Sequence, residues 1–153
     1  MSLPPVHRAF KPAVFETMSQ AETENAGESL GRTLRSGDVI LLFGELGAGK
    51  TAFVRGLARG IGAVPDEVTS PTFTIVQEYP AQPVTLFHVD LYRLDAAEID
   101  DLGLDDLISG EGIVAIEWAE RWKDRPNDAI EVVLEDVDDQ RRRVTISSTA
   151  PPE

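Results

Sequence analysis

Short apolar runs alternate with amphipathic stretches along the chain, and this alternation predicts a sheet that is covered by helices. Residues 39–43 and 112–117 are compact apolar runs, which are typical of buried strands. After the first run, Phe53, Leu57 and Ile61 recur every four residues, as expected for the buried face of a helix. The chain therefore predicts a strand followed by a helix, and a second buried strand further on.

Three other stretches have helical character. A capping-box pattern opens residues 20–35, where apolar residues recur at helical spacing until Gly37. Residues 95–107 have weaker helical character, which is interrupted by Gly103. A short helix is expected to carry both tryptophans, Trp118 and Trp122, on one face that packs in the core.

Several runs with alternating polarity predict hairpins. Residues 72–79 and 84–91 are separated by a proline-containing turn and predict an antiparallel pair of strands. Residues 129–135 and 142–147 predict a closing hairpin, and residues 13–17 a short edge strand. Together with the strand-helix alternation, these hairpins predict an α/β fold, a three-layer sandwich with a mixed parallel and antiparallel sheet.

The length and composition predict one domain. A chain of 153 residues can bury roughly 70% of its unfolded surface, so we expect a single domain over residues 1–153 with loose termini at 1–12 and 148–153. The chain has no Cys, no apolar run of about 20 residues and no basic leader followed by an apolar segment. A cytoplasmic protein without a membrane association is therefore expected.

The charge of the chain argues against direct, tight binding of nucleic acid. The sequence has 27 acidic and 14 basic residues, a net charge of −13. Proteins that bind RNA or DNA neutralise phosphates with Lys and Arg, which are scarce here. Residues 95–111 carry seven acids and no base, so this stretch either faces a basic partner or is a solvated surface.

Residues 44–51 fill every fixed position of the phosphate-binding loop pattern Gly-x-x-x-x-Gly-Lys-[Ser/Thr]. The strand and the helix that this loop requires lie directly before and after it. In such loops, backbone N–H groups and the helix N-terminus face an anion, the Lys reaches the outer phosphates and the hydroxyl holds magnesium. We expect a nucleoside triphosphate to be bound through Glu45, Leu46, Gly47, Ala48, Gly49, Lys50, Thr51 and Ala52.

Two predicted strands end in an acid that can complete this site. Asp90 and Glu117 each close an apolar run, and one acid can serve the magnesium shell while the other polarises the attacking water. We favour Asp90 on the metal and Glu117 beside metal or water, but the roles can be exchanged. Trp118 is expected near the nucleotide, and His88 as a packed or hydrogen-bonded structural residue.

Four segments, taken in order, resemble the TsaE family, formerly YjeE, of tRNA threonylcarbamoyladenosine biosynthesis. Their likeness extends from about residue 17 to residue 143, and one small departure is Glu45, where family members usually carry Asp. The matching segments are residues 44–51, Ser70-Pro71-Thr72-Phe73-Thr74 with Tyr79, His88-Val89-Asp90-Leu91-Tyr92-Arg93, and Ile116-Glu117-Trp118.

The resemblance implies a small P-loop NTPase-like ATPase that is slow alone and acts with the TsaB–TsaD complex. ATP hydrolysis would support formation of threonylcarbamoyladenosine next to the anticodon, and tRNA would be contacted only indirectly through the complex. The implied cofactors are ATP and Mg²⁺. The catalytic residues would be Lys50, Asp90 and Glu117, and the metal would be held by Thr51, Asp90 and Glu117.

Three other functions use the same loop. A small-molecule kinase needs an acceptor pocket and a lid, for which 153 residues leave little room. A regulatory GTPase needs an Asn/Thr-Lys-x-Asp segment, which the chain lacks. A non-catalytic nucleotide-binding regulatory subunit remains an alternative, and it predicts ATP binding without turnover.

Overall fold

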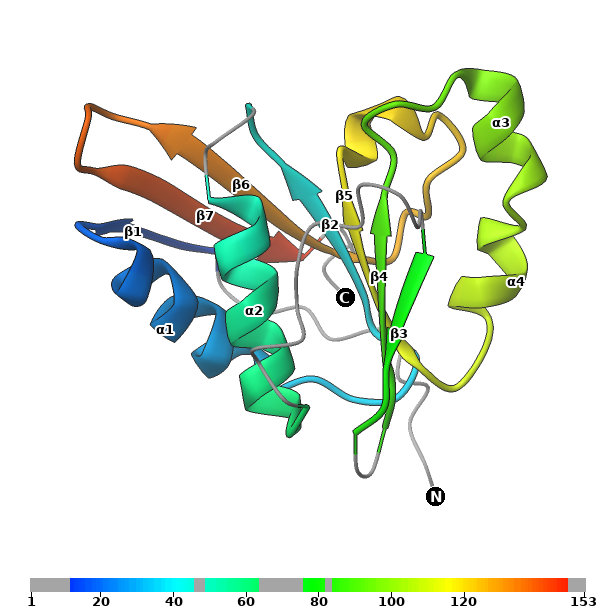
Figure 1. The fold of residues 1–153 in the computed structure, drawn as a ribbon, viewed down its shortest axis with the longest axis horizontal. Coiled ribbons are helices and arrows are strands. Elements are labelled where there is room, and N and C mark those ends of the chain that lie inside the picture. The colour runs from blue at the N-terminus through cyan, green and yellow to red at the C-terminus, as the bar shows by residue number, and fades with distance from the viewer. Residues whose placement is uncertain (1–11, 46–48, 64–75, 82–83, 149–153) are drawn as a thin grey trace.

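The computed structural model describes residues 12–45, 49–63, 76–81 and 84–148, and it contains a seven-stranded sheet with helices against it (Figure 1). The strands are β1 (Ala13–Thr17), β2 (Val39–Phe43), β3 (Val76–Tyr79), β4 (Leu86–Asp90), β5 (Ile113–Glu117), β6 (Ile130–Asp136) and β7 (Arg142–Ser148). The helices are α1 (Gln20–Gly31), α2 (Lys50–Ile61), α3 (Ala96–Asp101), α4 (Leu104–Ile108) and the 3₁₀ helix η3 (Ala119–Arg121).

The sheet is mixed, as the sequence predicts. Its strand order is β1-β7-β6-β2-β5-β4-β3. The four central strands β6, β2, β5 and β4 pair in parallel, whereas β3 and the β7–β1 pair add antiparallel strands at the two edges. Parallel strands end at the same edge of a sheet, so the residues that follow β2, β4 and β5 lie near one another.

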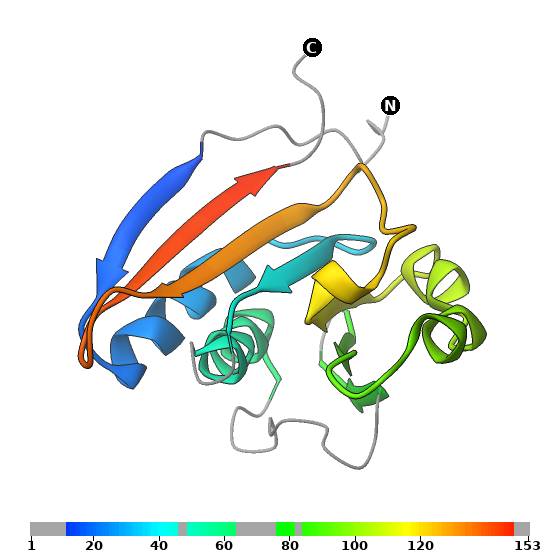
Figure 2. The same cartoon turned by 90° about the horizontal axis from the view of Figure 1, so that it is seen from above.

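The two faces of the sheet pack against different helices. In β2, Ile40 and Leu42 belong to a core cluster with residues of α1 and α2, whereas Val39 and Leu41 belong to a second cluster with residues of α3 and α4. Figure 2 shows the two pairs of helices against different parts of the twisted sheet. This division into helices, sheet and helices gives the predicted three layers.

Helices α1 and α2 pack closely because glycines lie between them. A Cβ on Gly56 of α2 would lie 2.8 Å from both the carbonyl carbon of Glu24 and the nitrogen of Glu28, which are backbone atoms of α1. Gly27, Gly31 and Gly60 are similarly crowded by the opposite helix. The side chains above this contact form ion pairs, including one of 2.8 Å between Arg55 and Glu24. The sequence pattern did not reveal this glycine contact.

Several element boundaries differ from the prediction, and the largest difference is at the end of α1. Helix α1 begins at the predicted N-cap, where Ser19 accepts a hydrogen bond from the N–H of Glu22, but it ends at Gly31 rather than at residue 35. Its last carbonyl groups are taken by turn bonds, and the Thr33 hydroxyl donates to the carbonyl of Leu30. Strand β7 includes Ser148, which the sequence assigns to a loose terminus.

Apart from the helix predicted through Trp118 and Trp122, the remaining elements match the prediction in kind. Gly103, with a φ of 72°, separates α3 from α4 at the predicted interruption. Strands β3 and β4 form the predicted antiparallel pair, although residues 72–75 lie outside the described part of the chain. No helix among the described residues is long and apolar enough to cross a membrane.

Candidate active site

The predicted phosphate-binding segment lies in the chain between the end of β2 at Phe43 and the start of α2 at Lys50. Glu45 is exposed, and Gly49 has a φ of 99° at the N-cap of α2, a conformation that L side chains rarely adopt. Lys50, Thr51 and the buried Ala52 form the first turn of the helix. Leu46, Gly47 and Ala48, which the sequence also predicts to bind nucleotide, lie outside the described residues.

Lys50 is buried although it carries an ammonium group. Its Nζ donates to the carbonyl oxygens of Gly44 and Glu45, the second at 2.9 Å, and lies 4.0 Å from the centroid of the Trp118 ring. Burial lowers the pKa of Lys50, although the charges of Glu117 and of three further acids act in the opposite direction. A buried cation that keeps its donors near a glycine-rich loop is suited to bind phosphate oxygens.

Glu117 connects the loop to the end of β5. The residue is 3% exposed, and its Oε2 accepts a hydrogen bond of 3.3 Å from the Thr51 hydroxyl. The same oxygen lies 2.5 Å from Nε2 of His88, which is fully buried on the neighbouring strand β4. The structure therefore brings together two predicted site residues, Thr51 and Glu117, and joins His88 to them.

Asp90 lies one strand further from the loop. It is the register partner of Glu117 in the parallel β4–β5 pair, so the two acids end neighbouring strands. Its Oδ1 accepts the N–H of Tyr92 at 2.9 Å, and its charge is among those that raise the pKa of Lys50. Asp90 is therefore near the site, but the direct contact with Thr51 belongs to Glu117.

Trp118 does not occupy the helix that the sequence predicts for it. Only residues 119–121 form a 3₁₀ turn, while Trp118 has a φ of 59° and Trp122 is extended and buried in the core. The left-handed conformation of Trp118 directly follows Glu117 and allows its ring to lie over Lys50. The two tryptophans thus have separate environments, with Trp118 beside the Lys50 ammonium and Trp122 in the core.

Aromatic and basic side chains that sequence reasoning did not place in the site surround Trp118. The Tyr92 ring lies 4.7 Å from the Trp118 ring, and the Arg121 guanidinium lies 5.7 Å and 5.9 Å from the centroids of these two rings. Tyr92 lies two residues after Asp90, and this position next to a predicted site residue is the sequence feature that could have indicated its place in the site. These residues extend the site from the loop toward η3.

The oxygen donors of the site suit a magnesium ion. Among the described residues there is no group of three or more His, Cys, Asp or Glu side chains that could enclose a metal. Magnesium bound with a nucleotide uses only one or two carboxylates, since phosphates and waters supply the other ligands. The Thr51 hydroxyl and the Glu117 carboxylate, already in contact, fit this requirement.

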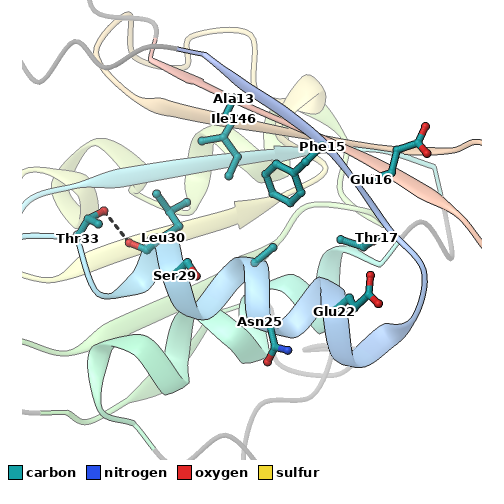
Figure 3. Close-up of a pocket in the computed structure, with 11 residues that line it drawn as sticks. Ala13, Phe15, Glu16, Thr17, Glu22, Asn25, Ser29, Leu30, Thr33 and Ile146 are labelled. Carbon is teal, nitrogen blue, oxygen red and sulfur yellow. Dashed lines mark hydrogen bonds between the residues drawn. The ribbon is translucent and has the colours of Figure 1, made fainter.

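An apolar groove of about 810 Å³ lies elsewhere, between β1 and α1 (Figure 3). Phe15, Ala26, Leu30 and Ile146 supply its apolar lining. Its lining contains none of Lys50, Thr51, Asp90 or Glu117. The groove is thus lined by different residues from those that surround the Lys50 ammonium.

Comparison with known proteins identifies relatives over most of the chain. Residues 17–144 match the family model described as "Threonylcarbamoyl adenosine biosynthesis protein TsaE". Several proteins named tRNA threonylcarbamoyladenosine biosynthesis protein TsaE are similar to this chain. The protein from Nostoc sp. strain PCC 7120 is 44% identical, over 82% of this chain and 79% of its own length. The protein from Bacillus subtilis strain 168 is 36% identical, over 90% of this chain and 87% of its own length.

A solved structure supports the same assignment. The crystal structure of Bacillus subtilis YdiB matches with a TM-score of 0.73 and 31% identity, and the match covers 94% of this chain and 88% of that one. The mixed sheet with a phosphate-binding loop after β2 confirms the predicted P-loop NTPase-like α/β fold. The family resemblance that the sequence motifs indicate is likewise confirmed, and the chain belongs to the TsaE family.

Proposed function

We propose that this protein is an ATPase that serves the formation of threonylcarbamoyladenosine in tRNA. Its relatives are named for that biosynthesis. The observation that carries the ATPase proposal is the contact between the phosphate-loop residue Thr51 and the buried acid Glu117, beside the buried ammonium of Lys50. This combination places a cation, a hydroxyl and a carboxylate at one end of the parallel strands, where phosphoryl chemistry needs them.

Lys50 and the loop bind and orient the phosphates of ATP in this proposal. The ammonium is a donor that can move from the carbonyl oxygens of Gly44 and Glu45 to phosphate oxygens. Its burial strengthens its attraction to a negative group, because little water screens the charge. Trp118 covers the ammonium on one side and restricts access of water to it.

Thr51 and Glu117 are the proposed magnesium ligands. Bound magnesium would neutralise charge on the phosphates. Glu117 is favoured over Asp90 for this role because it contacts the Thr51 hydroxyl, whereas Asp90 lies on the next strand. The sequence favours Asp90 as the metal ligand, so this proposal exchanges the two roles. Asp90 would then orient the attacking water or another water bound to the metal.

The proposed partners are the TsaB and TsaD proteins, with tRNA contacted only through their complex. The net charge of −13 supports an indirect contact, since the chain has too few basic residues to neutralise an RNA backbone. A low activity alone that rises with partners follows from this division of roles. The small-molecule kinase and the non-catalytic subunit have no feature in the described residues that favours them over this proposal.

Phosphate release from ATP, measured with and without the TsaB–TsaD complex, tests the proposal. We expect Glu117→Gln and Asp90→Asn to lower turnover by roughly 10² or more, because each removes a charge at nearly constant shape. Glu111→Gln is the matched control, since Glu111 is exposed and precedes the opposite end of β5. Wild-type turnover in the Glu117 variant, or ATP binding without hydrolysis in the complete complex, would refute the ATPase assignment.

A further inference from the structure

His88 is a polar side chain in a fully buried position of the sheet. It lies in β4 with no exposed surface, two residues before Asp90 and on the same face of the strand. Burial of a polar group is unfavourable unless the group makes a compensating hydrogen bond. The contact that compensates this burial is the one with Glu117, at 2.5 Å from Nε2 to Oε2.

The chemistry of this contact defines the form of the imidazole ring. A carboxylate only accepts hydrogen bonds, so Nε2 of His88 must carry the proton. The other ring nitrogen, Nδ1, is buried and has no hydrogen-bond partner among the described residues. The side chain is therefore held through Nε2, on the side that faces the active site.

The two contacts of Glu117 converge on a single oxygen. Oε2 accepts from both His88 and Thr51, whereas Oε1 makes no hydrogen bond within the part of the chain that the structure describes. Two donors from different elements, β4 and α2, fix the rotation of the carboxylate. Residues that orient a ligand side chain in this way commonly affect activity by roughly 10- to 100-fold.

We propose that His88 is a positioning residue that donates Nε2–H to Glu117 and fixes the direction of its carboxylate toward the nucleotide. This inference rests on the proposed ATPase function. In this role, His88 acts through its contact with Glu117 and not through a contact with substrate or metal. It acts by holding Glu117 against Thr51, so that Oε1 is presented in one orientation.

A pair of amide variants separates this role from simple packing. Gln places an N–H at about the reach of Nε2, whereas Asn is shorter and ends near the position of Nδ1. We expect His88→Gln to keep kcat within about threefold of wild type, and His88→Asn to lower kcat at least tenfold with little change in KM for ATP. Gln fills more of the buried space than Asn, so a packing role predicts that losses in kcat follow losses in melting temperature. The positioning role predicts a loss of kcat in His88→Asn that exceeds what its change in melting temperature explains.

Nitrogen NMR tests the contact without relying on activity. The chain has two histidines, so a His7→Gln variant assigns the ring signals of His88. We expect a proton on Nε2 in the wild type, and loss of this fixed state in Glu117→Ala. A proton on Nδ1 alone, or equal kcat in the Gln and Asn variants, overturns the positioning role. Absence of phosphate release by the wild type in its complex would instead refute the ATPase function and leave the NMR result to decide the contact.

Discussion

Replacement of Gly56 by Ala tests whether the glycine contact between α1 and α2 sets the position of the phosphate loop. The new Cβ would lie 2.8 Å from two backbone atoms of α1, and closer still to the carbonyl oxygen of Glu24. Backbone atoms cannot move aside by changing rotamer. The helices would have to separate by roughly 1.5 Å to restore ordinary contact distances.

The expected loss of stability follows from two opposing effects. Ala is preferred to Gly in a helix by about 1 kcal/mol, which would stabilise α2 if the space were free. Overpacking typically costs about 1–3 kcal/mol. We expect a cost of about 3 kcal/mol at Gly56, because a gap would open along the whole contact between the two helices. We expect a net destabilisation of about 2 kcal/mol, which lowers the melting temperature by roughly 4–8 °C in a chain of this size.

Thermal unfolding and nucleotide titration measure the two consequences. Helix α2 starts at Lys50, so its displacement should also weaken ATP binding. Ser29→Ala is the control, because Ser29 is exposed on α1 and its replacement raises helix propensity without a clash. A Gly56→Ala protein that melts at or above the wild-type temperature would show that the helices have space, and would refute the close-packing argument.

Three further predictions concern charge. Lys50→Met should abolish ATP binding in calorimetry and leave the melting temperature equal or higher. Burial lowers the pKa of this ammonium, so its charged form destabilises the folded state, and a lower melting temperature of the variant would contradict this. The backbone N–H groups of Gln140 and Arg141 and the Arg141 side chain lower the pKa of Asp138 from 3.8 to about 2. The ionised carboxylate should therefore stabilise the fold above about pH 4, and this stability should be lost as the pH falls toward 2. In Asp138→Asn, acid unfolding should lack this pH-dependent component. Charge reversal on the exposed acidic surface of α3 and α4 should slow association with TsaB–TsaD and leave ATP binding unchanged. Added salt should weaken this effect on the association rate. Unchanged association kinetics at low salt would place the interface elsewhere. The reversed residues are Asp100, Asp101, Asp105 and Asp106.

The chain pattern alone predicts the local elements of this protein. An apolar run, a glycine-rich motif and a four-residue apolar repeat specify β2, the phosphate loop and α2, because each depends on neighbours in sequence. The same is true of the Ser19 cap and of the Gly103 break. The family resemblance also came from linear motifs, and comparison with relatives confirms it.

Only the tertiary structure decided which of these elements meet. Strand β5 lies next to β2, so Glu117 at its end is brought into contact with Thr51, and no local pattern specifies the order of strands in a sheet. The contacts of Trp118 with Lys50 and of His88 with Glu117 likewise join residues that are far apart in the chain. The sequence specifies which side chains are present, whereas the pairing of strands that are distant in the chain determines which of these side chains come into contact.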